Sequence, residues 1–156
     1  MSDTTASARA IIEGHSIRRS IRVKASVDKV WAAITEPEQI AQWMGDTASF
    51  TAFEVGATGT WGWEGHGEFP LVITEIDPKK TFAVRWAGET AKLTDDDSTT
   101  IRMTIEVDGD ETVLTVVESG FESLAGGTAY RRRRLQENKD GWNEELDELL
   151  AYLERP

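Results

Sequence analysis

Apolar and polar residues alternate over a long stretch of this chain, between residues 47 and 121. The segments TWGWEG, FPLVITEID, TFAVRWAG, TTIRMTIEVDG and ETVLTVVESGF are each strand-like, and glycine, proline, aspartate or serine separates them. A period of two indicates strands with one buried face, and we count about six strands. Links this short join antiparallel strands, because parallel strands need long crossovers. The sequence therefore predicts one antiparallel sheet with an apolar face that another element must cover.

Two short helices are predicted before this stretch. Ser26 can cap the first helix, and Pro37 can end it and open a second helix that stops at Gly45. Helices that meet at a proline would form a V-shaped brace across one end of the sheet. The residues expected to face inward are Val27, Val30, Trp31, Ile34, Ile40, Trp43 and Met44.

A long helix is predicted at the C-terminus. Trp142, Leu146, Leu149, Leu150 and Leu153 recur at helical spacing, and this spacing reaches back to Leu135. Gly141 would then lie inside the helix, at a cost of about 1 kcal/mol relative to alanine. We expect the glycine to bring the helix backbone close to the sheet or brace, or to bend the helix, while Trp142 enters the concave face. The alternative is that Gly141 separates two helices.

A hairpin signal orients the last two strands. Asp-Gly in VDGDET suits a tight turn, which puts Ile101, Met103 and Ile105 on one face with Leu114 and Val116. The same parity places Glu118 on that face. If the face is concave, burial would favour the protonated carboxyl, which could anchor a ligand or act as a general acid. The alternative is a glutamate at the strand end that reaches solvent.

Length and composition limit the classes of function. A chain of 156 residues suits one domain, which we place at residues 15–156 after a flexible leader at residues 1–14. The net charge of −11 argues against nucleic acid or an anionic membrane as partner. We expect no membrane span and no signal peptide, and therefore a cytoplasmic protein. The chain has no cysteine, which excludes disulfides and cysteine nucleophiles.

The two ends of this pattern resemble a known family. ASVDKVWAAITEPEQIAQWM and GWNEELDELLAYLE are similar to the two ends of the domain found in activators of the heat-shock-protein ATPase, within the START and Bet v 1-like (helix-grip) superfamily. GHGEFPLVITEIDPKKTFAVRWAGE and TVLTVVESGF resemble its central and last strands. The resemblance implies an α+β helix-grip fold, in which a curved antiparallel sheet of six or seven strands holds a long C-terminal helix around an internal cavity.

Function follows less directly from this resemblance, because fold alone does not fix function. We expect a small hydrophobic ligand between the sheet and the C-terminal helix, with no cofactor, no metal and no catalytic residue. The alternatives are a stress-related activator that binds a chaperone or other protein, and a cyclase-like enzyme. The expected cavity residues are Trp63, Phe69, Leu71, Phe82, Val84, Trp86, Met103, Leu114, Val116, Glu118, Trp142 and Leu146.

Two further features carry weaker signals. His66 is flanked by glycines, with Glu64 and Glu68 on either side, so it could ligate a metal but better fits a turn between strands. The basic run YRRRRLQENKD could contact an anionic ligand, although a solvated helical face with an Arg133–Glu137 pair is the favoured interpretation.

Overall fold

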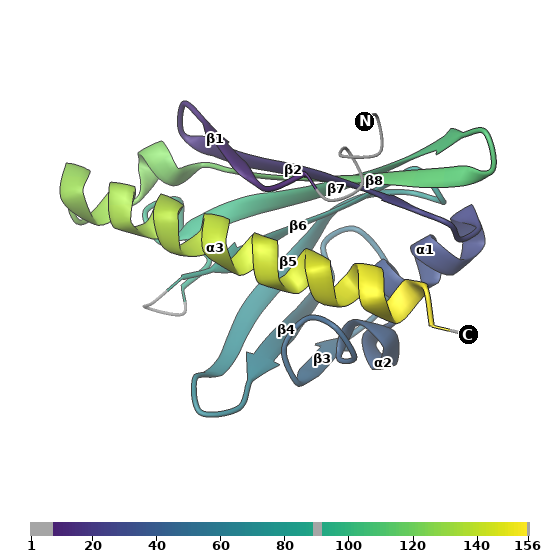
Figure 1. The fold of residues 1–156 in the computed structure, drawn as a ribbon. Helices are drawn as coiled ribbons and strands as arrows, with labels where there is room; N and C mark the ends of the chain where they lie inside the picture. Colours follow the sequence, from purple (N-terminus) through teal and green to yellow (C-terminus); the bar gives the residue numbers. More distant parts are fainter. Residues whose placement is uncertain (1–7, 89–91, 156) are drawn as a thin grey trace.

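The computed structural model describes residues 8–88 and 92–155. It contains an eight-stranded sheet in the order β1-β2-β8-β7-β6-β5-β4-β3. The strands are β1 (Ile11–Glu13), β2 (Ser16–Val23), β3 (Thr47–Phe50), β4 (Thr58–Trp63), β5 (Gly67–Asp77), β6 (Thr81–Ala87), β7 (Ser98–Asp108) and β8 (Glu111–Ser119). The helices are α1 (Val27–Thr35), α2 (Pro37–Ile40), the short 3-10 helix η2 (Phe121–Ser123) and α3 (Thr128–Leu153). Figure 1 shows the sheet curving around α3, which confirms the predicted α+β helix-grip fold.

The strand pairing agrees with the predicted register. The six strands expected between residues 47 and 121 are β3 to β8, and each pairs with its neighbour in an antiparallel sense. In the last hairpin Asp108 pairs with Glu111, which leaves a two-residue turn. Ile101 pairs with Glu118 across β7 and β8. Glu118 therefore shares a face with the apolar residues of both strands, as the hairpin parity predicted.

The N-terminal edge differs from the prediction. Residues 11–13 form β1, although residues 1–14 were expected to be a loose leader; residues 1–7 of that leader lie outside the described residues. Strand β2 pairs with β1 on one side and with β8 on the other. Strand β2 is therefore internal to the sheet, because β1 supplies the edge.

The brace forms as two helices, but the second is shorter than predicted. The Ser26 hydroxyl caps α1 by accepting the Lys29 backbone N–H at 3.1 Å. Helix α2 ends at Ile40 rather than near Gly45, and turns follow it. Glycine suits this turn because Gly45 takes a positive φ of 70°, and a Cβ there would collide with the carbonyl oxygen of Gly62. Trp43 and Met44 are buried as predicted.

Helix α3 is continuous through Gly141, so the alternative of two separate helices is wrong. Its buried apolar residues are Leu135, Trp142, Leu146, Leu149 and Leu153. A buried arginine from β2, Arg19, donates to the carbonyl of Asn143 at 2.9 Å and to the Asp147 carboxylate at 2.7 Å. These contacts fix the middle of α3 against β2, beside Trp142.

The core lies between the concave face of the sheet and the helices. Apolar side chains from β2 and β4 to β8 gather on this face and pack with α1, the segment after α2, and α3. Within residues 8–88 and 92–155, no helix is long and apolar enough to cross a bilayer.

Candidate functional site

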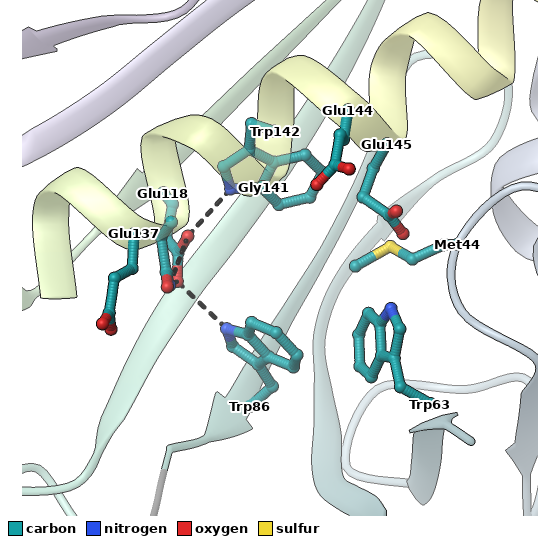
Figure 2. Close-up of a pocket in the computed structure, with 10 residues that line it drawn as sticks. Met44, Trp63, Trp86, Glu118, Glu137, Gly141, Trp142, Glu144 and Glu145 are labelled. Carbon is teal, nitrogen blue, oxygen red and sulfur yellow. Dashed lines mark hydrogen bonds between the residues drawn. The ribbon is translucent and has the colours of Figure 1, made fainter. Parts of the chain in front are cut away.

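A pocket of about 190 Å³ opens between α3 and the sheet. Figure 2 shows indoles from the sheet and from α3 around it, with Met44 and Glu145 on one side and Glu118 on the other. The lining residues are Met44, Trp63, Trp86, Glu118, Glu137, Asn138, Gly141, Trp142, Glu144 and Glu145. The pocket therefore joins residues from β4, β6, β8, α3 and the brace.

Glu118 closes one side of this pocket and is completely buried. Oε1 accepts the Trp142 indole N–H at 2.8 Å, and Oε2 accepts the Trp86 indole N–H at 3.0 Å and the Thr99 hydroxyl at 2.5 Å. The Asn138 amide donates to both oxygens, at 3.2 and 3.1 Å. A carboxylate offers about four lone-pair sites, so these donors use its whole capacity. The alternative in which Glu118 reaches solvent is therefore wrong. The main effect of Glu118 is to fix the Trp86 and Trp142 indoles.

The sheet side of the pocket is an aromatic cluster. The Trp63 and Trp86 ring centroids lie 5.8 Å apart, and Phe69 lies 5.6 Å from Trp63 and 5.9 Å from Trp86. Trp61 packs behind them, 5.6 Å from Trp86. Tilted and edge-to-face contacts of this kind hold the rings in fixed orientations.

Glu145 occupies the opposite side of the pocket, where a second hollow begins. It lines both cavities, together with Trp63 and Glu144. Its Oε2 accepts the Gly45 backbone N–H at 3.1 Å, which links α3 to the turn after α2. Burial raises the pKa of Glu145 to about 7, and Glu144 and Glu148 add to the rise, while hydrogen bonds from Gly45 and Trp63 oppose it.

The structure brings together four of the predicted cavity residues: Trp63, Trp86, Glu118 and Trp142 line this pocket. Phe69 contacts two of these indoles without lining the pocket. The other predicted residues lie in the core: Leu71, Phe82, Val84, Met103, Leu114, Val116 and Leu146. They lie away from the pocket because side chains of α1, α3 and the sheet fill the rest of the concave face.

Sequence reasoning missed the polar residues that α3 contributes. Asn138 stands four residues before Trp142 and Glu145 three residues after it, so both share its helical face. Gly141 lies three residues after Asn138 and four before Glu145, which places it beside the same face. That spacing was a usable signal once Trp142 was assigned to the cavity. Glu144 and Glu145 were missed because an acidic pair in a helix usually indicates a solvated face.

Gly141 has a different role from the one predicted. A Cβ added there would meet no atom within 4 Å beyond its neighbours and its own helix. The glycine therefore does not permit close packing of the helix on the sheet or brace, and that expectation is wrong. It instead leaves space where α3 borders the pocket.

The two weaker sequence signals have separate outcomes. His66 is exposed in the turn between β4 and β5, as the turn interpretation predicted. No group of three or more potential metal-ligating side chains occurs in the described residues. In the basic run, Arg132 and Arg133 are exposed, and the Nε atom of Arg133 lies 3.9 Å from Oε2 of Glu137. Arg134 is buried and donates to the Tyr130 hydroxyl at 3.0 Å, so the interpretation as a solvated face is wrong for this residue.

Several solved structures share this fold. DynU16, from the dynemicin biosynthetic locus, is 25% identical with a TM-score of 0.70, and the match covers 91% of this chain and 48% of DynU16. This chain thus spans about half of that protein. MLL2253 from Mesorhizobium loti is 20% identical with a TM-score of 0.75, over 90% of this chain and 97% of its own.

A third solved structure shares the fold, and a family model identifies the family. The Aha1 dimer from Colwellia psychrerythraea is 23% identical with a TM-score of 0.69, over 89% of this chain and 96% of its own. No curated protein matches the sequence. The family model described as "Activator of Hsp90 ATPase homolog 1-like protein" matches residues 24–154. Because the match extends from α1 to the end of α3, this chain belongs to the Activator of Hsp90 ATPase homolog 1-like family.

Proposed function

We propose that this protein reversibly binds a small hydrophobic molecule, in the cytoplasm, in the pocket between the sheet and α3. The observation that supports this proposal is the aromatic lining by Trp63, Trp86 and Trp142. Ligand sites are concave and combine aromatic walls with fixed polar groups, and the three indoles and Glu118 give this pocket both. Glu118 and Arg19 hold α3 and two indoles in place, so the site is formed before a ligand arrives.

The pocket volume limits the size of the ligand. A dry cavity of about 150 Å³ in another protein holds a benzene-sized molecule. The volume of about 190 Å³ here suits one ring with small substituents. A larger molecule would extend through the open side, beyond Glu144 and Glu145.

The test uses Gly141, a lining position without a side chain. Gly141→Phe should fill the pocket, whereas Gly141→Ala adds one methyl group in open space and serves as the matched control. Native mass spectrometry of gently purified protein should show an extra mass with the native chain and Gly141→Ala, and none with Gly141→Phe. An equal extra mass on folded Gly141→Phe would contradict binding in this pocket.

A specific observation favours a second function, the docking of another protein. Phe53 and Val55 are 45% and 60% exposed, and Phe53 borders a shallow hollow with Trp31 and Phe50. The family name refers to activation of the Hsp90 ATPase, and exposed apolar groups of this kind occur at docking sites. Under this hypothesis the chain raises the ATPase rate of an Hsp90-type chaperone.

The two functions are separable by variants. Exchange of both Phe53 and Val55 for serine should abolish stimulation of the chaperone ATPase, and Gly141→Phe should leave it intact. Loss of stimulation in Gly141→Phe alone would count against a docking role for the Phe53 surface.

A cyclase-like activity has less support from the geometry. It needs at least two polar side chains that converge on a substrate. Glu118 and Asn138 converge on the pocket, but they are hydrogen-bonded to each other.

A further inference from the structure

The pocket has a negative electrostatic character that a purely hydrophobic ligand does not need. In the described part of the chain, every ionisable side chain that lines it is acidic: Glu118, Glu137, Glu144 and Glu145. The adjoining hollow adds Asp46 and Glu148. Because part of this charge faces a partly enclosed space, it would repel an anionic ligand and attract a cation.

The aromatic lining is also suited to a cation. Three indoles, Trp63, Trp86 and Trp142, border the same small space from β4, β6 and α3 (Figure 2). A cation within about 6 Å of an indole face is attracted by the ring quadrupole, and tryptophan gives the strongest interaction of this kind. Several aromatic rings around one space are the arrangement that recognises substituted ammonium groups.

Glu118 should strengthen this attraction. The N–H groups of Trp86 and Trp142 both donate to its carboxylate. A hydrogen bond to an anion polarises the donor, which moves electron density from the N–H into the indole ring. The ring surfaces that border the pocket therefore become more negative than those of a free indole.

We propose that the pocket selects an organic cation, an ammonium group carried on a small apolar body, over neutral or anionic molecules of the same shape. This inference rests on the proposed binding function and specifies the class of ligand. Glu144 and Glu145 supply the charge on the open side, and the three indoles enclose the ammonium group.

The experiment compares two probes of equal shape that differ by one charge. Phenyltrimethylammonium and tert-butylbenzene are isosteric, and their dissociation constants can be measured on the full chain by NMR titration. The cation should bind at least about tenfold more tightly. Equal affinities would overturn cation selection and leave pocket binding intact. No binding of phenyltrimethylammonium up to about 1 mM, together with none of tert-butylbenzene up to its solubility limit in water, would overturn both proposals.

Variants test the source of the preference. Glu145→Gln should reduce the ratio of the two affinities by about threefold or more. Glu106→Gln removes the same charge from an exposed position on β7 and should leave the ratio unchanged. An unchanged ratio in Glu145→Gln would overturn the role of this carboxylate.

The pH dependence gives a second readout on the unmodified chain. Glu145 faces Glu144 and Glu148 on its own helix, Gly45 and Asp46 after α2, and Trp63 on β4. Because its pKa is about 7, the affinity for the cation should rise between about pH 6 and pH 8, whereas that for tert-butylbenzene should not. A flat profile for both probes would contradict the proposal.

Discussion

At the scale of single residues, Glu118 is the group that organises the pocket. A buried charge is tolerated only when hydrogen bonds replace its lost hydration, and donors from β6, β7 and α3 do so here. These contacts join β8, which carries Glu118, to three other elements at one point. The orientation of two walls of the pocket therefore depends on one carboxylate.

Replacing Glu118 by glutamine should destabilise the fold by about 2–3 kcal/mol. The new amide NH₂ would face N–H and O–H donors and leave at least one buried group unsatisfied. Equilibrium unfolding in urea measures the loss. Glu106→Gln, at an exposed site, should change the free energy of unfolding by less than about 0.5 kcal/mol. Similar small effects in both variants would contradict the structural role of Glu118.

Glu145 should make stability depend on pH in the opposite direction from a salt-bridged carboxylate. Its folded pKa of about 7 lies above its unfolded value, so stability is lost as pH rises from that unfolded value through about 7. Glu145→Gln removes this loss, although solvent at the open side of the pocket reduces its size. The melting temperature of the variant relative to the native chain should therefore be higher at about pH 8 than at about pH 5. An equal difference at both pH values would contradict the raised pKa.

At the scale of elements, helix α3 both covers the sheet and borders the pocket. Its leucines pack into the core, while Asn138, Gly141 and Glu145 face the pocket. Two features keep the helix from closing this space: the missing side chain at Gly141 and the anchor that Arg19 forms with Asp147.

Gly141→Ala should stabilise the protein by about 0.5–1 kcal/mol. The position is helical, and the added methyl group meets no atom within 4 Å beyond its own helix. Thermal or urea unfolding gives the result. A destabilised variant would show that the helix does approach another element closely at this residue.

Asp147→Asn should weaken the attachment of α3 to β2 by about 1–3 kcal/mol, because it leaves the buried Arg19 without its carboxylate. Burial raises the pKa of Asp147, but hydrogen bonds from Arg9 and Arg19 outweigh this and hold the pKa below its usual value. The stability that Asp147 contributes is therefore present above the pKa of its carboxyl in the unfolded chain. This stability is lost as pH falls through the pKa of Asp147 in the folded protein. Urea unfolding of the native chain and of Asp147→Asn at neutral and acid pH measures this stability, with Asp140→Asn on the exposed side of α3 as control. A loss that persists undiminished in acid would contradict this assignment.

At the scale of the whole molecule, the fold could be predicted because its signals are local and mutually consistent. The Asp-Gly turn fixed the parity that placed Glu118 on the concave face, and the spacing of Trp142 and Leu146 identified the covering helix. The family model agrees with this result over residues 24–154.

The extent of the pocket could not be predicted, because it depends on how fully side chains fill the concave face. Leu71, Phe82 and Val84 alternate on their strands just as Trp63 and Trp86 do, yet only the two tryptophans border open space. Burial raises the pKa of Glu145, and the Gly45 N–H that partly offsets this rise comes from a residue 100 positions away in the sequence. Such contacts exist only after the chain has folded.

The most direct test of pocket binding is an NMR titration that follows the six indole N–H signals with toluene as a neutral aromatic probe. Binding in this pocket should shift the signals of Trp63, Trp86 and Trp142. It should change little at Trp31 and at Trp43, whose N–H donates to the Ala33 carbonyl. Shifts confined to Trp31, or saturation without any change at Trp86 and Trp142, would contradict a ligand site between the sheet and α3.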